Sequence, residues 1–572
     1  MKKLHLVFLS MLVAAFSHSQ TYRLTWGEEV KLKKGTADLD IIAVDNTGLY
    51  FAESRIKMKG YFIVAASYGE SQKLVKLDKN YGEVFEKEYK KELKGLAFHS
   101  FQNMGENLYM FATDYDRKSK TFKVMGSKID KSTGDLSGDF MELGSYQLES
   151  KRDDFEISVN TIEDGKAFLL VSNISGDDKV SLGVHVLDKM LKRKESAVIN
   201  LNFKPDNYTL QGVTVNKKNK IILLGKEFEE TQIGRKKRKR MVFKQYVMSI
   251  YDFNGKKEKD VKIDSDDRYI ISGKLIEKPD GEVLLAGFFS NNAKKDDIHG
   301  FYINKVDPDN GTLVVSSYKE INTSMLGKGV IDDSEDDDES KREKKEAKKA
   351  KEDDEEDEFP NSFTIKSVIF NPADESIIIT SEVSAYSYYA LRSYNASTKT
   401  WSTTHVHRFT NKDVLVINAD KNGNIKWLNA IPKYQIEEVR TSNGGGGWSY
   451  YDAAGGLFAR AGGMPYYSSF TSILHGNSLV LIMNDHTSNN VNAEYGDKVK
   501  AVANFRKKSN VYGISIDLAT GKMTRKVIGS NREDAILMPR HAYVIKNELV
   551  MPSWRQHMLA KTDLKFARIQ VK

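Results

Sequence analysis

The stretch "VYGISIDLATGK", residues 511–522, contains the pattern that decides the fold. Apolar and polar residues alternate up to Asp517, which is typical of a half-buried strand. Asp517 and Gly521 then mark a tight turn, because an Asp side chain bonds its own backbone and Gly accepts a positive φ. The stretch therefore predicts a strand that ends in a hairpin turn, with a second strand after it.

The same strand and turn recur along the chain. The clear copies are "VKLDKNYG" at Asp78, "SKIDKSTG" at Asp130, "IYDFNG" at Asp252, "NKVDPDNG" at Asp307 and "NADKNG" at Asp420. A further copy, "HVLDKMLK" at Asp188, is weaker because it lacks the glycine. A strand-like run follows each of them, so the chain repeats one hairpin unit.

A second phrase, a polar turn followed by an apolar strand, occurs eight times upstream of these hairpins. Its copies begin at Gly60, Glu106, Gly165, Asn219, Gly281, Glu375, Gly476 and Asn547. Most neighbouring copies lie about 50 to 60 residues apart, which is the spacing of four-stranded propeller blades. The repeat therefore predicts eight blades.

The eighth copy lacks sequence for a complete blade, because only "KFARIQVK" follows it as a strand. An unassigned strand-like run, "TYRLTWGEEVKL" at residues 21–32, stands at the other end of the chain. We expect residues 21–32 to complete the blade built from 535–572, since closure removes exposed sheet edges. The predicted fold is an all-β, eight-bladed β-propeller formed by residues 20–572, and the alternative is two stacked β-sandwich domains.

This blade pattern resembles the secreted β-propellers of the quinoprotein-like and kelch-like kind. The resemblance covers essentially all of the chain after residue 19. It implies the fold and not the activity, because propellers serve many functions. The sequence also departs from these families: it lacks the paired kelch glycines with their tryptophan and tyrosine, the "WD" blade ending and any adjacent cysteines.

Residues 1–19 have the composition of a secretory signal peptide. Lys2 and Lys3 precede the apolar run "LVFLSMLVAAF", and Ser17 and Ser19 supply small residues at the cleavage positions. We expect Gln20 to begin the mature chain; the alternative is an uncleaved anchor. Cysteine is absent from the 572 residues, so disulfides and an N-terminal lipid anchor are excluded. No later segment approaches the apolar length of a membrane span. These features predict export to the periplasm or surface of a Gram-negative bacterium.

The long irregular segments should share one face of the propeller. In a blade, the turns between strands one and two and between strands three and four lie on one side, which we call the turn face. The opposite side, the loop face, holds the loops between strands two and three and the connections between blades. Four long segments belong to the loop face, namely 229–242, 323–361, 434–467 and 485–509. Loops on a rigid scaffold carry function, so the loop face is the predicted binding surface.

The connection 323–361 contains a highly charged run. Residues 332–359 have sixteen acidic and seven basic residues, a net charge of −9. Such a segment cannot bury a core, and we expect it to be disordered or a solvated helix. Three interpretations fit this run: a charged loop without a partner, a segment that associates with calcium, and a segment that docks on a basic partner. The spacing of an EF-hand calcium loop is absent from it.

A basic run stands in the segment 229–242. Its residues are Arg235, Lys236, Lys237, Arg238, Lys239 and Arg240. A secretion signal makes a nucleic-acid role unexpected, and acidic lipid headgroups, an anionic polymer or the acidic run 332–359 are the alternatives. Without Lys2 and Lys3 the net charge falls from +8 to +6, and outside 332–359 it is +15. A basic propeller body favours an anionic partner.

The segment 434–467 is rich in glycine and in aromatic residues. Exposed rings on such a loop are natural anchors for a sugar, a peptide or another protein, and the alternative is that the loop folds over the channel and buries them. The candidate anchors are Trp448, Tyr450, Tyr451, Phe458, Tyr466 and Tyr467.

Signals for enzyme chemistry are few. His405, His407 and His486 are candidate metal ligands, because a His-x-His pair projects both rings to one side of a strand. Arg540, Arg555 and His557 border the predicted channel mouth and are candidates for contact with a small ligand. We predict no catalytic residue and no cofactor.

The sequence thus favours a non-enzymatic, exported propeller. It would bind a protein in the cell envelope as an assembly or accessory subunit, at an outer-membrane transport or secretion complex. The alternative is an enzyme or small-ligand receptor with its site at the channel mouth of blades six to eight.

Overall fold

The computed structural model describes most of the chain after residue 20. It covers residues 21–572 except 33–35, 60–66, 151–152, 164, 234–237, 262, 264–267, 292–297, 322–329, 332–356, 359–361, 396, 398, 444–465, 491–496, 532–535 and 556–561. The signal-peptide prediction and most of the acidic run 332–359 therefore lie outside the described residues.

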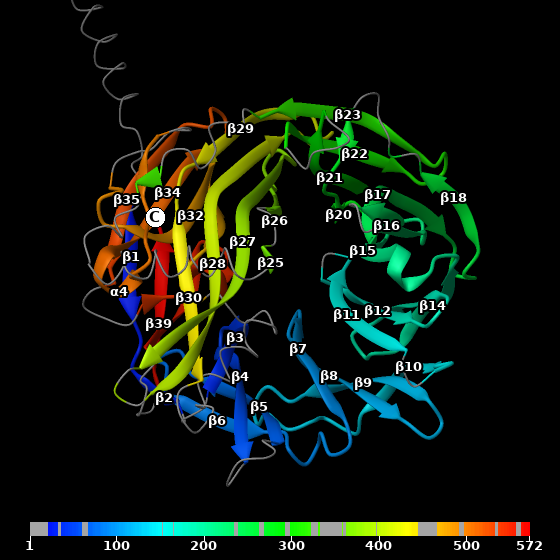
Figure 1. Ribbon diagram of the computed structural model, residues 1–572, viewed down its shortest axis with the longest axis horizontal. Helices are drawn as coiled ribbons and strands as arrows, with labels where there is room; N and C mark the ends of the chain where they lie inside the picture. The colour runs from blue at the N-terminus through cyan, green and yellow to red at the C-terminus, as the bar shows by residue number, and fades with distance from the viewer. Residues whose placement is uncertain are drawn as a thin grey trace, which may run out of the picture.

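Eight antiparallel sheets stand around a common centre and form a β-propeller (Figure 1). We number the blades in chain order, and in each blade the first strand is innermost. The described ring of separate sheets rules out two stacked sandwiches.

The first four blades have four strands each. Blade 1 contains β3 (Thr36–Asp45), β4 (Gly48–Lys59), β5 (Ser67–Leu77) and β6 (Glu83–Glu88). Blade 2 contains β7 (Ala97–Met104), β8 (Asn107–Asp116), β9 (Thr121–Ile129) and β10 (Met141–Gln147). Blade 3 contains β11 (Asp154–Ile162), β12 (Ala167–Ser175), β13 (Val180–Leu187) and β14 (Arg193–Leu201). Blade 4 contains β15 (Tyr208–Val215), β16 (Ile221–Ile233), β17 (Arg238–Tyr251) and β18 (Lys257–Val261), preceded by η1 (Pro205–Asn207).

The last four blades are more irregular. Blade 5 contains β19 (Tyr269–Ile270), β20 (Lys274–Glu277), β21 (Val283–Ser290), β22 (Gly300–Asp307) and β23 (Thr312–Glu320). Blade 6 contains β25 (Asp357–Glu358), β26 (Ser362–Phe370), β27 (Ile377–Asn395), β28 (Thr400–Ala419), β29 (Ile425–Ile431) and β30 (Gln435–Asn443). Blade 7 contains β31 (Phe470–His475), β32 (Ser478–His486), β34 (Ser509–Asp517) and β35 (Met523–Ser530). Blade 8 contains β36 (Ile536–Leu537), β37 (Tyr543–Ile545), β38 (Glu548–Arg555) and β39 (Thr562–Val571), with η4 (Pro539–His541). A short parallel pair, β24 (Val330–Ile331) and β33 (Val499–Lys500), and the helix α4 (Phe505–Lys508) lie in the long connections.

Blade 8 takes its outermost strands from the N-terminal segment. β1 (Tyr22–Trp26) runs antiparallel to β39, with Tyr22 opposite Val571, and β2 (Val30–Leu32) pairs with the start of β39. The pairing expected between residues 21–32 and the C-terminal segment is therefore present. The ring of Tyr22 lies against blade 7, where a Cβ on Gly513 would approach it within 2.4 Å.

The strand boundaries correct three of the sequence-based expectations. The second strand of blade 1 is β4, so the copy placed at Gly60 was twelve residues too late; residues 60–66 lie outside the described residues. Much of the segment 229–242 is strand, because β16 and β17 continue as a hairpin beyond their sheet. The segment 434–467 begins with β30, which pairs with β28.

The Asp–Gly phrases form the turns between third and fourth strands, as predicted. Asp78 Oδ1 accepts hydrogen bonds from the backbone N–H groups of Asn80 and Gly82, at 2.8 and 2.9 Å. Asp252 and Asp420 make the same two bonds in blades 4 and 6. The aspartate thus satisfies the donors that a tight turn exposes.

Each turn also docks on the preceding blade. The hydroxyl of Tyr50 in blade 1 donates to the carbonyl oxygen of Lys131 in the turn of blade 2, at 3.1 Å. Tyr109 of blade 2 donates to Lys189 of blade 3 at 2.8 Å. Trp427 of blade 6 donates to Leu518 of blade 7 at 3.0 Å. The repeated phrase therefore joins neighbouring blades as well as neighbouring strands.

The turn glycine is needed for this docking. Gly255 has a φ of +76°, and a Cβ there would lie 2.3 Å from the carbonyl oxygen of Val198 in blade 3. In the weak copy of blade 3, Leu191 replaces the glycine and keeps a φ of +59°. Its side chain is buried in the cluster between blades 2 and 3, so side-chain packing offsets the backbone strain.

We predict that Gly255→Ala destabilises the propeller by about 2–4 kcal/mol. Alanine in the left-handed region costs about 1–2 kcal/mol, and the overlap with Val198 adds a similar amount. The free energy of unfolding from urea denaturation measures this loss.

Gly165→Ala is the matched control. Gly165 has the same φ of +76°, but a Cβ there meets nothing within 4 Å. This variant should lose only the backbone contribution, about 1–2 kcal/mol. Equal losses in the two variants would contradict a docking role for the turn.

Candidate functional site

A long hairpin projects from blade 6 on the loop face. Its strands β27 and β28 have 19 and 20 residues, about twice the length of their neighbours. Residues 377–382 and 414–419 pair within the blade, whereas 384–395 and 400–411 pair beyond it. β30 then adds a third strand along residues 403–411. Figure 1 shows the two ribbons extending well past their sheet. The segment is rich in aromatic residues and threonine, which favour strands.

One face of this hairpin carries aromatic residues in its inner part and at its far end. Residues paired directly across an antiparallel ladder project to the same side. The pairs Tyr388–His407 and Tyr394–Trp401 therefore share a face with Tyr386. The hydroxyl of Tyr386 lies 2.7 Å from His407 Nδ1, and the ring centroids of Tyr394 and Trp401 are 5.2 Å apart.

The aromatic face is covered near the blade and open at its far end. His407 is buried, whereas 51% of Tyr394 and 68% of Trp401 are exposed. Two cations, Arg392 and Lys399, are exposed beside this pair. The far end, which we call the hairpin tip (Arg392, Tyr394, Lys399 and Trp401), therefore combines apolar ring area with positive charge.

The chain that leads into blade 7 covers the inner part of the hairpin. The buried carboxylate of Glu437 on β30 accepts hydrogen bonds from the backbone N–H groups of Tyr466, Tyr467 and Ser468, at 2.8, 2.9 and 3.0 Å. Burial raises the pKa of Glu437, and these hydrogen bonds oppose the rise. Glu437 therefore ties the hairpin to the next blade.

A buried ion pair lies at the base of the hairpin. Lys433 Nζ is 2.5 Å from Glu382 Oε1, and both side chains are fully buried. Lys366 and the hydroxyl of Ser469 contact the other carboxylate oxygen, at 3.1 and 2.7 Å. Burial alone raises the pKa of Glu382, but the charges of Lys433 and Lys366 outweigh it and hold the pKa below its usual value.

The network continues through amide side chains into blades 7 and 8. Gln435 accepts from Lys433 Nζ at 2.7 Å and donates to the carbonyl oxygen of Asn484 at 2.6 Å. Asn484 in turn donates to the carbonyl oxygens of Tyr467 and Leu537 at 2.8 Å. Blades 6, 7 and 8 are thus joined by polar contacts that fix the direction of the hairpin.

The histidines of the metal hypothesis belong to strands of two neighbouring blades. His405 and His407 lie within β28, and His486 ends β32 in the next blade. Among the residues that the structure describes, no group of three or more His, Cys, Asp and Glu side chains is placed to hold a metal ion. His407 instead contacts the rings of Tyr386 and Tyr388.

Some of the remaining candidate residues lie in the described part of the chain and the others lie outside it. Arg238, Lys239 and Arg240 begin β17, Arg540 is exposed in η4, and Arg555 ends β38. Tyr466 and Tyr467 are half-buried against the cluster between blades 8 and 1. The candidates that lie outside the described residues are Arg235, Lys236, Lys237, Trp448, Tyr450, Tyr451, Phe458 and His557.

Sequence reasoning missed the hairpin tip. The signal was present in "YSYYALRSYN" and "TWSTTHVHRF", which continue the period-two pattern of a strand beyond the length of a blade.

Within the described residues, helices of the length and apolarity that crossing a bilayer requires are absent.

Comparisons with known proteins show similarity of fold only. No protein-family model and no curated protein matches the chain. The chain is similar to the β-propeller domain of the Trilobed protease from Pyrococcus furiosus, at 11% identity and a TM-score of 0.30 over 69% of this chain and 95% of that one. It is also similar to prolyl oligopeptidase B from Galerina marginata, at 10% identity and a TM-score of 0.31 over 65% of this chain and 46% of that one. A protein of unknown function from Dyadobacter fermentans has 9% identity and a TM-score of 0.27 over 73% and 95% of the two chains. These values carry no information about activity, and membership of the quinoprotein-like or kelch-like group stays a prediction.

We predict that Lys433→Met lowers the free energy of unfolding by about 3 kcal/mol, because removing one partner leaves the buried Glu382 carboxylate poorly compensated. Adding Glu382→Gln to this variant should recover part of the loss. Urea denaturation measures both effects.

Lys421→Met is the control for this prediction. Lys421 lies 3.6 Å from Glu375, and both side chains are largely exposed. Its loss should stay below about 1 kcal/mol. A loss as small as this in Lys433→Met would show that the buried pair does not hold the base of the hairpin.

Proposed function

We propose that this protein is a non-enzymatic binding propeller, which docks a protein partner on its loop face and serves as an accessory subunit of an assembly. The observation that carries the proposal is the exposed Tyr394–Trp401 pair at the hairpin tip. Clustered exposed rings are unusual on a protein surface and are typical anchors of interfaces.

The construction of the hairpin supports a docking role. Its base is fixed by the Glu382–Lys433 pair and by Glu437, so the tip is presented in one direction. A preordered element loses little conformational entropy when it binds, which favours affinity. The basic run 235–240 and the aromatic residues of 434–467 belong to the same face in this proposal.

The partner has an acidic surface. Arg392 and Lys399 flank the rings, and the chain outside residues 332–359 has a net charge of +15 after Lys2 and Lys3 are removed. Complementary charge speeds encounter and sets orientation, while the desolvated rings supply most of the affinity.

The proposed location is the envelope of a Gram-negative bacterium, at an outer-membrane transport or secretion complex. Its support is the composition of residues 1–19, with a basic start, an apolar run and small residues at the cleavage positions. Cleavage before Gln20 would leave the pairing of β1 intact, since Thr21 and Lys572 exchange backbone hydrogen bonds at 3.1 and 2.9 Å.

The combined substitution Tyr394→Ala and Trp401→Ala should reduce recovery of the partner at least about tenfold, because truncating an anchor ring typically costs 1 kcal/mol or more. The measurement is quantitative affinity capture of the tagged full chain from the solubilised envelope of its own organism. Capture by the wild-type chain should also weaken as salt is raised.

Met190→Ala is the control, because Met190 is 56% exposed in a turn of the opposite face. It should recover the partner as the wild-type chain does. Equal recovery by the hairpin variant would refute docking at the tip.

We predict that the exported chain begins at Gln20, and intact-mass analysis of protein recovered from the envelope measures this. A chain that keeps Met1 would contradict cleavage of the signal and favour the uncleaved anchor.

A further inference from the structure

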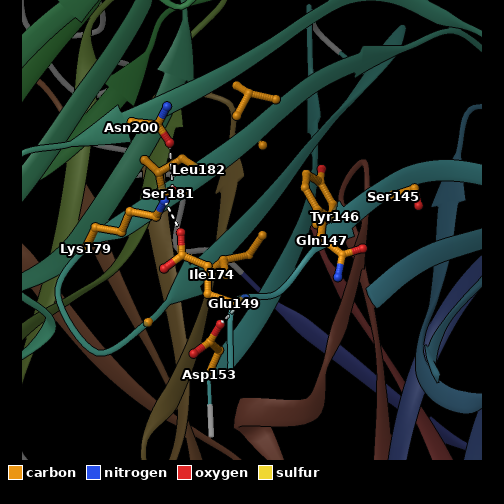
Figure 2. Close-up of a pocket in the computed structure, with 13 residues that line it drawn as sticks. Ser145, Tyr146, Gln147, Glu149, Asp153, Ile174, Lys179, Ser181, Leu182 and Asn200 are labelled. Carbon is orange, nitrogen blue, oxygen red and sulfur yellow. Dashed lines mark hydrogen bonds and ion pairs between the residues drawn. The ribbon is translucent and has the colours of Figure 1, made fainter. Parts of the chain in front are cut away.

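A pocket of about 300 Å³ lies between blades 2 and 3 (Figure 2). Its walls come from the outer strand β10, from the connection that follows it, and from the β12–β13 turn with β13 and β14. The connection and the turn both belong to the loop face. The pocket is therefore accessible from the same face as the hairpin tip without sharing residues with it.

Asp153 forms the base of this pocket and is 92% buried. Its Oδ2 accepts hydrogen bonds from the backbone N–H groups of Glu149 and Ser150, at 2.8 and 3.0 Å. Its Oδ1 is also buried but has no hydrogen-bond partner within the described part of the chain. A Cβ on Gly176 would lie 3.6 Å from this oxygen, so Oδ1 is directed toward the β12–β13 turn.

The nearest lining cation does not neutralise Asp153. Lys179 forms its ion pair with Glu149 instead. Figure 2 shows these two residues above Asp153, and Tyr146 and Gln147 to the right of them. A buried carboxylate oxygen without a donor is unfavourable, and such groups in native proteins call for an explanation.

The opposite wall is apolar and rigid. Ile174, Leu182 and Val198 line it together with the ring of Tyr146. The Tyr146 hydroxyl lies 2.6 Å from His185 Nε2, and His185 Nδ1 lies 2.8 Å from the hydroxyl of Ser196. Burial lowers the pKa of His185 to about 4, so the ring is neutral at pH 7 and adds no positive charge beside the pocket.

A glycine makes room for this wall. A Cβ on Gly183 would lie 2.1 Å from the Tyr146 hydroxyl oxygen, so only glycine lets the ring lie flat on β13. The shape of the pocket is therefore set in the absence of any ligand.

We propose that this pocket binds a primary ammonium or guanidinium group on a short aliphatic stem, with Asp153 Oδ1 as the acceptor. An ionised carboxylate can only accept hydrogen bonds, and a cation supplies both the missing donor and the compensating charge. The stem would pack on Ile174 and Leu182. The volume is at the lower end of the range for small-ligand sites, which suits a ligand of this size.

The cation has two possible sources, a free amine or a basic side chain of a peptide. The test is isothermal titration of the full mature chain with 1,5-diaminopentane, agmatine and N-acetyl-lysine methylamide. The neutral probes are 1-pentanol and glucose. We expect saturable binding of at least one cationic probe at one site, and no binding of the neutral probes. Binding by the amines alone identifies a free ligand, and binding by the lysine derivative alone identifies a peptide.

Asp153→Asn should weaken cation binding at least tenfold. The substitution keeps the shape, and the amide oxygen can still accept from Glu149 and Ser150, so the thermal unfolding midpoint should change little. Asn200→Trp provides a second variant, since Asn200 is an exposed lining residue and the larger tryptophan side chain would fill the pocket. It should abolish binding.

Asp116→Asn is the matched control, because Asp116 is exposed at the β8–β9 turn on the same face but does not line the pocket. Its affinity for the probes should equal that of the wild-type chain. Failure of every cationic probe to bind, equal binding in Asp153→Asn, or equally tight binding of the neutral probes would each overturn the proposal.

Discussion

The architecture depends on the contact between each Asp–Gly turn and the sheet that precedes it. A four-stranded sheet exposes two apolar faces, and stacking blades around a ring buries both. The turns set how closely neighbours approach: Tyr50 and Tyr109 donate across the gap, and Gly255 brings its backbone against Val198. This requirement constrains the turn face in every blade. The loop face takes no part in these contacts, so its segments are free to lengthen.

In blades 6 to 8 the segments of the loop face are long, and buried charged and polar side chains hold them in place. The Glu382–Lys433 pair, Gln435 and Asn484 form contacts that other arrangements of the hairpin would break. Buried ion pairs add little net stability compared with apolar packing. Here the network instead gives the hairpin a defined direction, which the proposed docking role requires. The pocket at Asp153 is built differently: Gly183 and Tyr146 determine its shape. In our proposal the Asp153 Oδ1 atom accepts the hydrogen bond of a ligand.

Local chemistry explains what the sequence could and could not predict. The Asp–Gly turns follow from Asx hydrogen bonding. The spacing of the eight apolar-strand phrases led to eight blades, and the incomplete eighth copy led to the pairing of residues 21–32 with the C-terminal strand. The first blade was misplaced because residues 60–66 are more apolar than the strand β4 that precedes them. Trp401 and Tyr394 were missed because alternation continues unchanged from blade to hairpin. Contacts such as Glu382 to Lys433, 51 positions apart, and the walls around Asp153, which come from two blades, leave no local signal.

The sharing of blade 8 by both ends of the chain determines when the ring can be completed. Thr25 bonds to Arg568 across 543 positions, so the last sheet can form only after residue 568 has been synthesised. Contacts of such long range form slowly, because the loop entropy is lost before they stabilise the fold. Until then blades 7 and 1 each expose an apolar surface that β1 and β39 later cover. The ring therefore stays incomplete in the nascent chain until both segments of blade 8 have been made.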